Sequence, residues 1–309
     1  MSTNEAVEAL HASLTAPQRR AICFDWDYLD PDRGLLRSFI SNHWQATRPA
    51  VRSAFFSAKQ QALIHDVYTG LVDSAWYPRF MKQLRDDTLG HEWGTNQSIA
   101  FFEEPGTGTL QFVFSGRHTT LRAQAGGASP LAFGGPILYG HQATGYYERV
   151  NHPGNVFWDQ AMAASTLAAM LEEPQLASAV VDRLPLESEI GFGAVHPGLD
   201  AAAMDGAQRA QLARVLSAVL APLRASDRER AMQCLAAQGG IERCRISFAR
   251  DGRMSTPHWD NWRLEGPAIV VHYQGFPHVH VWLHISESPD VVVNSRNGVY
   301  LYPEHDPLR

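Results

Sequence analysis

Histidines spaced two residues apart near the end of the chain are the residues best suited to chemistry. Residues 277–285 have the sequence PHVHVWLHI. Alternate side chains of a β-strand point to the same face, so His278, His280, Trp282 and His284 would lie together. Two imidazoles at this spacing are about 7 Å apart along the face, which lets both bind one metal ion. The segment is therefore a candidate metal site, with a solvated polar sheet face as the alternative.

A third imidazole is expected from residues 110–121, which have the sequence LQFVFSGRHTTL. As one continuous strand, this segment would place alternate residues on one face: Phe112, Phe114, Gly116, His118 and Thr120. His118 would then lie among aromatic rings, where a neutral imidazole needs a partner. If this strand and the HxH strand share a sheet, His118, His278 and His280 form a three-histidine site with an open position. Gly116 would leave room there for a ligand close to the backbone.

Two further histidines are candidates for completing this site. His272 precedes the loop that leads to His278, and its face depends on the loop length. A four-residue loop pairs Tyr273 with His278 and turns His272 to the opposite face, whereas a five-residue loop pairs His272 with His278. His272 could also act indirectly, by hydrogen-bonding a ligating imidazole. His258, beside Trp259 in a predicted loop, is the second candidate.

Charged residues near these histidines are candidate catalytic groups. Arg263 and Glu265 are two apart in a predicted strand and share a face. They could orient a carboxylate-bearing substrate or a ligating imidazole, and a structural ion pair is the alternative. Arg117, which directly precedes His118, is grouped with them. Glu265 or Asp260 could also supply the carboxylate that a two-histidine iron site requires.

Helical and strand patterns come in blocks along the chain. Residues 1–95 are mainly helical, strand patterns occupy 98–121, and further helices lie within 157–237 before strands return at 241–285. Blocks rather than alternation predict an α+β fold, with helices packed on an antiparallel sheet or partly closed barrel. We expect residues 96–309 to form the α+β body and the first segment to pack on it as one compact unit. No internal repeat is recognisable.

Composition limits the classes of partner. The chain has 309 residues and a net charge of −6, with 26 basic and 32 acidic side chains. No block of Lys or Arg is present, so nucleic acid is not an expected partner. Charged residues make up only 19%, which is consistent with extensive buried surface, including the subunit contact of a homo-oligomer. A signal-peptide pattern, a membrane-length apolar run and a CxxC motif are all absent, which predicts a cytoplasmic protein with no membrane partner.

The expected function is metal-dependent chemistry on a small organic molecule. GxSxG, P-loop, GxGxxG and HExxH motifs are absent, which disfavours serine hydrolases, nucleotide hydrolases, dinucleotide enzymes and zincins. An all-imidazole site suits copper, iron or zinc, and the affinity order favours copper. Five aromatic residues would make a dry pocket suited to redox chemistry: Phe112, Phe114, Trp259, Trp262 and Trp282. We expect an oxygen-dependent copper or iron oxidoreductase; a zinc hydrolase, a non-catalytic metal or ligand carrier and a structural protein are the alternatives.

The order of these segments resembles a bacterial family known as domain of unknown function DUF3500. The resemblance extends over most of the chain and is carried by these segments: Ser13-Leu14, Gln18-Arg19, Arg33-Gly34-Leu35, 57–61, 105–121, Ala207-Gln208, Trp262-Arg263, Gly266-Pro267 and His278-Val279-His280. The glycine-plus-histidine strand and the HxH strand are its most specific parts. Relative to the family, Arg117 replaces a histidine and His272 replaces an acidic residue. The resemblance implies a shared fold and supports the histidine site, and it implies no activity.

Overall fold

The computed structural model describes residues 1–127, 131–142, 148–193, 196–252 and 258–301. Within these residues, eight helices accompany one mixed sheet of eleven strands. The strand order is β1-β6-β7-β8-β9-β15-β14-β13-β12-β10, and β11 pairs with β12 off this path. The sheet is open rather than closed into a barrel. The expected α+β class is therefore confirmed, with parallel pairs only where short strands are added.

The main elements of the first half are α1 (Thr3–Ala12), α2 (Ala16–Ile22), β1 (Cys23–Asp25), α3 (Ala58–Leu71), α4 (Tyr77–Asp87), β6 (Ser98–Glu103), β7 (Leu110–Gly116), β8 (Thr119–Ala125) and β9 (Ile137–His141). Those of the second half are α5 (Asp159–Met170), α6 (Glu173–Ala179), β10 (Val180–Val181), α7 (Gly206–Leu220), α8 (Ala225–Ala237), β12 (Arg245–Ala249), β13 (Asn261–Gly266), β14 (Ile269–Gln274) and β15 (Val279–Ile285). Short strands complete the list: β2 (Leu29–Asp30), β3 (Gly34–Leu35), β4 (Phe39–Ile40), β5 (His43–Trp44), β11 (Leu199–Asp200), β16 (Asn294–Ser295) and β17 (Val299–Tyr300). Single 3-10 turns are η1 (Leu36–Ser38), η2 (Ala132–Gly134), η3 (Glu187–Glu189), η4 (Ala201–Ala203) and η5 (Ile241–Arg243).

The two halves of the chain follow the same order of elements. Each has a pair of helices, a short strand, a second pair of helices and four consecutive antiparallel strands. The short strand, β1 or β10, runs parallel to the first long strand of its half, β6 or β12. The last strands, β9 and β15, pair antiparallel at the centre of the sheet. The sheet therefore has a pseudo-two-fold axis between β9 and β15, and the chain holds a structural repeat that is not recognisable in its sequence.

A hydrogen-bonded pair of glutamines recurs at matching places in the halves. Gln18 in α2 donates to Gln60 in α3, and Gln175 in α6 donates to Gln208 in α7, each at 3.0 Å. Gln60 and Gln208 are both at position N3 of a capping box, where the side chain satisfies a free N–H at the helix start. Each also donates to a carbonyl group near the end of the first helix of its half, α1 or α5. The repeat is therefore encoded by a few scattered positions, which sequence periodicity alone does not reveal.

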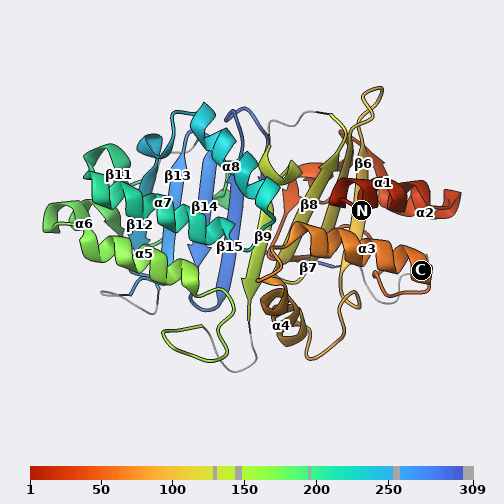
Figure 1. The fold of residues 1–309 in the computed structure, drawn as a ribbon, viewed down its shortest axis with the longest axis horizontal. Coiled ribbons are helices and arrows are strands. Elements are labelled where there is room, and N and C mark those ends of the chain that lie inside the picture. The colour runs from red at the N-terminus through yellow and green to blue at the C-terminus, as the bar shows by residue number, and fades with distance from the viewer. Residues whose placement is uncertain (128–130, 143–147, 194–195, 253–257, 302–309) are drawn as a thin grey trace.

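Helices cover one face of the sheet (Figure 1), and irregular segments pack on the other. We call these the helix-covered face and the loop-covered face. Leu36 and Phe39 pack on strand residues of the first half on the loop-covered face. Ile40 and Ile190 pack there on Trp282 and its neighbours near the centre of the sheet. The loop-covered face therefore lies beneath the segments that contain η1, β4 and η3.

The aromatic residues expected around the metal site are divided between the two faces. Phe112, Phe114, Trp259 and Trp262 belong to the large core on the helix-covered face. Trp282 belongs to a separate cluster on the loop-covered face. The expected dry aromatic pocket is therefore not formed by these five residues, because the strand pleat directs most of them away from the histidines.

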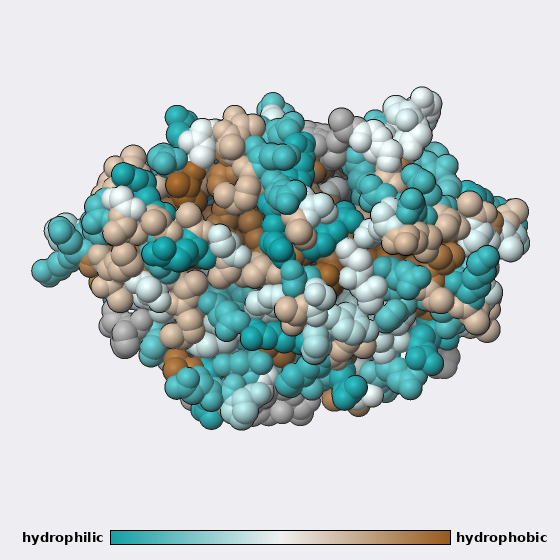
Figure 2. Space-filling view, in the orientation of Figure 1, coloured by the Kyte–Doolittle hydropathy of each residue, from teal (hydrophilic) through white to brown (hydrophobic). Residues whose placement is uncertain are grey.

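The outer surface of the helices is chemically mixed. Hydrophilic residues, drawn in teal, spread across it, and hydrophobic residues, drawn in brown, show mainly as patches between the helices (Figure 2). Among the helices of the described residues, none is both long enough and apolar enough to cross a membrane.

Candidate metal centre

His118 is held in a tight turn between β7 and β8. Gly116 pairs with Thr119, so only Arg117 and His118 form the connection. His118 has a φ of 50°, a left-handed conformation that is uncommon outside glycine but that histidine adopts more often than most residues. Its N–H donates to the carbonyl oxygen of Asn42 at 2.8 Å.

The turn corrects the expectation of one continuous strand through residues 110–121. Phe114 pairs with Leu121, and both face the helices. The chain reverses at His118, so the imidazole does not share a face with Phe114. A Cβ on Gly116 would lie 2.9 Å from Cγ of Gln97. The space beside Gly116 is therefore filled by Gln97 rather than left for a ligand.

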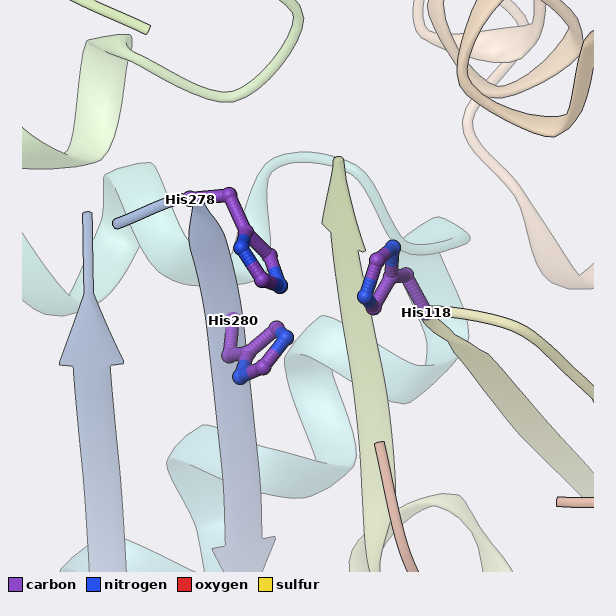
Figure 3. Close-up of side chains that lie close together, drawn as sticks. All are labelled: His118, His278 and His280. Carbon is purple, nitrogen blue, oxygen red and sulfur yellow. The ribbon is translucent and has the colours of Figure 1, made fainter. Parts of the chain in front are cut away.

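Three imidazoles meet over the centre of the sheet. His118 comes from the β7–β8 turn, and His278 and His280 come from the start of β15; Figure 3 shows the rings converging above β9. One ligand nitrogen of each lies within 4.8 Å of the others. The ring centroids of His118 are 4.9 Å from those of His278 and His280. Tetrahedral coordination at about 2.0–2.1 Å places nitrogens roughly 3.3 Å apart, so small side-chain movements suffice to bind one ion.

Buried carboxylates orient two of these rings. Nδ1 of His118 lies 2.7 Å from Asp87, and Nδ1 of His280 lies 2.5 Å from Glu187. A carboxylate accepts only from a protonated Nδ1, which leaves Nε2 with a free lone pair for a metal. Nε2 of His280 is buried without a hydrogen-bond partner, as a ligand atom would be before it binds its ion.

The same carboxylates are fixed by further hydrogen bonds. Asp87 accepts from the side chain of Gln83 and the N–H of Gln142. Glu187 accepts from the indole of Trp282 at 3.1 Å and from Asn42. Asp87 and Glu187 were not among the residues expected at the site, because they lie at the end of α4 and in η3, far along the chain from the histidines that they contact.

Burial favours the neutral forms of His118 and His278. It lowers the pKa of His118 well below the usual value, with further contributions from His280 and Arg117. It also lowers the pKa of His278 to about 3, with help from His280 and His118. Burial raises the pKa of Asp87 to about 6, which still leaves it ionised near neutral pH. Neutral imidazoles can bind a metal without first losing a proton.

Glu187 remains ionised for a different reason. Burial by itself raises its pKa, but the charge and hydrogen bond of His280 and the hydrogen bond of Trp282 outweigh it and lower the pKa to about 2. Two ionised carboxylates, Asp87 and Glu187, thus contact His118 and His280 on the side away from the proposed ion. They match the charge of a divalent cation at the centre.

Gly140 allows the strands that carry the histidines to approach each other. It pairs with His280 across β9 and β15, and its N–H donates to the carbonyl oxygen of His118 at 2.9 Å. A Cβ here would lie 2.2 Å from the carbonyl oxygen of Val279 and 3.3 Å from Cβ of His118. Any larger residue would push apart the two elements that supply ligands.

His272 shares the loop-covered face with the three histidines but lies farther along the sheet. Gln274 pairs with His280, and His272 pairs with Trp282. Neither loop length considered from the sequence gives this register, although the five-residue loop gives the correct face. His272 does not belong to the group of ligand nitrogens, nor does His258, which adjoins Trp259 in the helix-side core. The three-residue set is therefore His118, His278 and His280.

The predicted catalytic residues occupy two places. Arg117 donates to Gln142 at 2.6 Å and to the carbonyl oxygen of Asp87, so it lies beside the centre. Arg263 and Glu265 lie two strands from His280, where Nε of Arg263 donates to Glu265 at 2.7 Å. The carboxylate of Glu265 also accepts from the N–H of His196. Arg263 and Glu265 are thus an ion pair at a distance from the three imidazoles.

A second group with metal-ligand chemistry is less suited to an ion. His11, Cys23 and Glu103 approach one another at the sheet edge. Arg19 lies 2.9 Å from Nε2 of His11, which places a cation where a metal would bind. Burial raises the pKa of Cys23 to about 12, so its thiol stays protonated. This group is an ion-pair network.

Comparisons with known proteins agree with the resemblance seen in the sequence. The family described as "Protein of unknown function (DUF3500)" matches residues 1–286. No curated protein matches the chain, and no solved structure does. Because the match covers most of the chain, including every residue of the candidate metal centre, the protein belongs to the DUF3500 family.

Proposed function

We propose that the protein is a metal-dependent enzyme whose ion is bound by His118, His278 and His280. The observation that carries the proposal is the pair of Nδ1–carboxylate hydrogen bonds, which directs Nε2 of two buried imidazoles toward the third. A merely structural histidine cluster would satisfy its own nitrogens. Here Nε2 of His280 stays buried and unpartnered, which favours an ion as its partner.

The ligand set favours copper, with iron or zinc as the other candidates. Three imidazole ligands without a carboxylate ligand suit copper by ligand type and by affinity order. His278 is half-buried, so the centre has one side on which a small organic substrate or oxygen could bind. A bound copper ion would supply one-electron chemistry with oxygen, and a zinc ion would supply a nucleophilic hydroxide. We therefore favour an oxygen-dependent oxidoreductase.

In this proposal, neighbouring residues orient the ligating imidazoles, control the charge of the carboxylates behind them and exclude water. Asp87 and Glu187 hold His118 and His280 in the tautomer that can bind a metal. Arg117, whose side chain lies beside Asp87, would keep that carboxylate ionised and limit its basicity. Trp282 donates to Glu187 and packs with Ile40 and Ile190, which would exclude water from the inner side of the centre.

Metal analysis tests the proposal directly. Protein prepared without an affinity-column metal should contain one equivalent of a transition metal. His278→Ala should lose that metal, and His91→Ala, a change at an exposed histidine, should keep it. Equal metal content in both variants, or none in the wild type after reconstitution with copper, iron and zinc salts, would contradict a metal centre.

Oxygen dependence distinguishes the candidate functions. Metal-loaded protein should consume oxygen when supplied with small organic reductants, and His278→Ala should not. Turnover that persists without oxygen would instead indicate the zinc hydrolase. Stoichiometric metal with no turnover of either kind would indicate a binding protein.

A further inference from the structure

Unpartnered polar atoms gather on the loop-covered face of β13, β14 and β15, away from the three ligating imidazoles. Nη1 and Nη2 of Arg263, Nδ1 of His272 and Nδ1 of His284 are all buried and have no hydrogen-bond partner. The three side chains belong to residues that are 1%, 2% and 1% exposed. Burying such donors without a partner is costly, and proteins rarely leave one unpaired. Four in one region indicate a missing partner rather than chance.

The strand register brings these donors together. Arg263 pairs with His272, and His272 pairs with Trp282 on the next strand. His284 lies two residues beyond Trp282 on the same face. Paired residues are about 5 Å apart and a two-residue step is about 7 Å, so the three Cα atoms lie within roughly 12 Å. Side chains of this length can meet around one small ligand.

The hydrogen bonds already made by Arg263 leave the outer end of its guanidinium free. Its Nε donates to Glu265, and Glu265 is also engaged by the N–H and ring of His196. The two terminal nitrogens present the planar fork that binds an oxyanion through parallel hydrogen bonds. Each imidazole adds one N–H donor when its Nδ1 is protonated.

The charges around His284 are positive. Burial lowers the pKa of His284, and Arg122 and Arg263 lower it further; the opposing group is the backbone of Leu283, through a hydrogen bond, rather than a carboxylate. Arg122 directs its donors to the carbonyl oxygens of Pro136, Arg37 and Phe39 rather than to an acidic side chain. Glu187, on the His280 side of His272, is already engaged by His280, Trp282 and Asn42. An anion near His284 would therefore meet two cations.

We propose that Arg263, His272 and His284 form a second ligand site, distinct from the metal centre, that binds one small oxyanion. The ligand class is a carboxylate or a phosphate, because both present paired oxygens to a guanidinium. The other ring nitrogen of His284, Nε2, lies 3.5 Å from the hydroxyl of Ser295. The proposal does not depend on the metal centre.

Binding to metal-free protein tests the site. Inorganic phosphate and acetate would each be titrated calorimetrically into the full chain. We expect one saturable equivalent of at least one of them. Binding of acetate alone would identify a carboxylate site, and binding of phosphate would identify an inorganic or phosphorylated ligand. Absence of saturable binding by both anions would overturn the proposal.

Variants locate the binding. Arg263→Lys keeps the charge beside Glu265 but removes the fork, and we expect it to weaken binding by about tenfold or more. Arg245→Lys is the matched control, because Arg245 pairs with Glu265 across β12 and β13 but is bound to Asp200. It should bind as the wild type does. Unchanged binding in Arg263→Lys would overturn the proposal.

A second variant serves if Arg263→Lys fails to fold. His284→Gln should weaken binding by about tenfold through loss of one donor and leave the ion pair of Arg263 intact. His278→Ala separates the two sites, since it should lose metal but bind the anion as the wild type does. Loss of anion binding in His278→Ala would contradict a distinct site, whatever the metal result.

Discussion

Two turns at the edge of the sheet, which we call its corners, are related by the pseudo-two-fold axis and differ in chemistry. At one corner the turn between β7 and β8 carries His118, whose carbonyl oxygen accepts from Gly140. At the other the turn between β13 and β14 carries Ala268, whose carbonyl oxygen accepts from Ser286, also at 2.9 Å. The two turns thus share their length and this backbone hydrogen bond. They differ in that His118 has a positive φ whereas Ala268 does not, and only the first corner has an imidazole.

The elements that face these turns also differ. β15 begins at Val279, so its HxH segment lies opposite His118. In the other half η2 (Ala132–Gly134) occupies the approach to β9. Asp87 at the end of α4 supports the ring of His118, whereas Gln238 after α8 hydrogen-bonds the backbone of Ala268. The scaffold is therefore duplicated, and the metal chemistry depends on side chains found in one copy.

The largest expected effect comes from adding a side chain at Gly140, where β9 lies close to β15. Gly140→Ala should lower the free energy of unfolding by about 3 kcal/mol, because the new Cβ meets the backbone of Val279. Urea denaturation measures this. Gly206→Ala, where nothing lies within 4 Å, is the control and should be neutral or slightly stabilising. Equal stability of the two variants would show that this close approach does not constrain the corner.

Removing the carboxylates should weaken metal binding. Asp87→Asn and Glu187→Gln should each lower metal affinity by about 10- to 100-fold, since the rings lose the group that fixes their tautomer. Competition with a chelator of known affinity measures the change. Glu189→Gln, at an exposed position two residues from Glu187, should bind metal normally. Wild-type affinity in both carboxylate variants would show that the corner needs only its three histidines.

Acid should destabilise the second half through its buried histidines. Burial lowers the pKa of His272 and of His284 to about 3, with Arg263 adding to the effect at both. Folded-state values below the unfolded value of about 6.5 mean that stability is present above about pH 6.5 and is lost as the pH falls toward 3. Each histidine should cost about 1.4 kcal/mol of unfolding free energy at about pH 5.5.

Replacing His284 by the residue found at the matching position of the first half tests the predicted loss of unfolding free energy in acid. The strand registers about the axis place Leu138 at the position that matches His284. His284→Leu in metal-free protein should reduce the loss of unfolding free energy between about pH 7.5 and 5.5 by about 1.4 kcal/mol. An unchanged pH dependence would mean that His284 is already protonated in the folded protein.

The smallest expected effect is at the other corner. Ala268→His places an imidazole at the position that matches His118, but η2 takes the place of the HxH segment and Gln238 takes the place of Asp87. Metal stoichiometry should therefore stay at that of the wild type, as measured by elemental analysis after reconstitution. A second bound equivalent would show that the duplicated turn is enough to make a metal site.

Local patterns predicted much of this architecture. Helical patterns within residues 1–95 and 157–237 predicted the regions of α3 and α7, and strand patterns within 241–285 predicted the region of β13 to β15. The HxH pattern identified His278 and His280, because in a strand two positions share a face whatever the rest of the chain does. The strand ending at Gly116 was extended too far, since a histidine in a left-handed turn leaves no local signal comparable to glycine.

The sequence by itself determined the element types, the α+β class and the pairing of His278 with His280 on one face, all of which depend on residues near one another in the chain. Only the tertiary structure decided that His118 meets them and that Asp87 and Glu187 orient the rings. It also decided which aromatic residues face away. These contacts join positions tens to hundreds of residues apart, and they depend on strand order and register, which local periodicity does not encode.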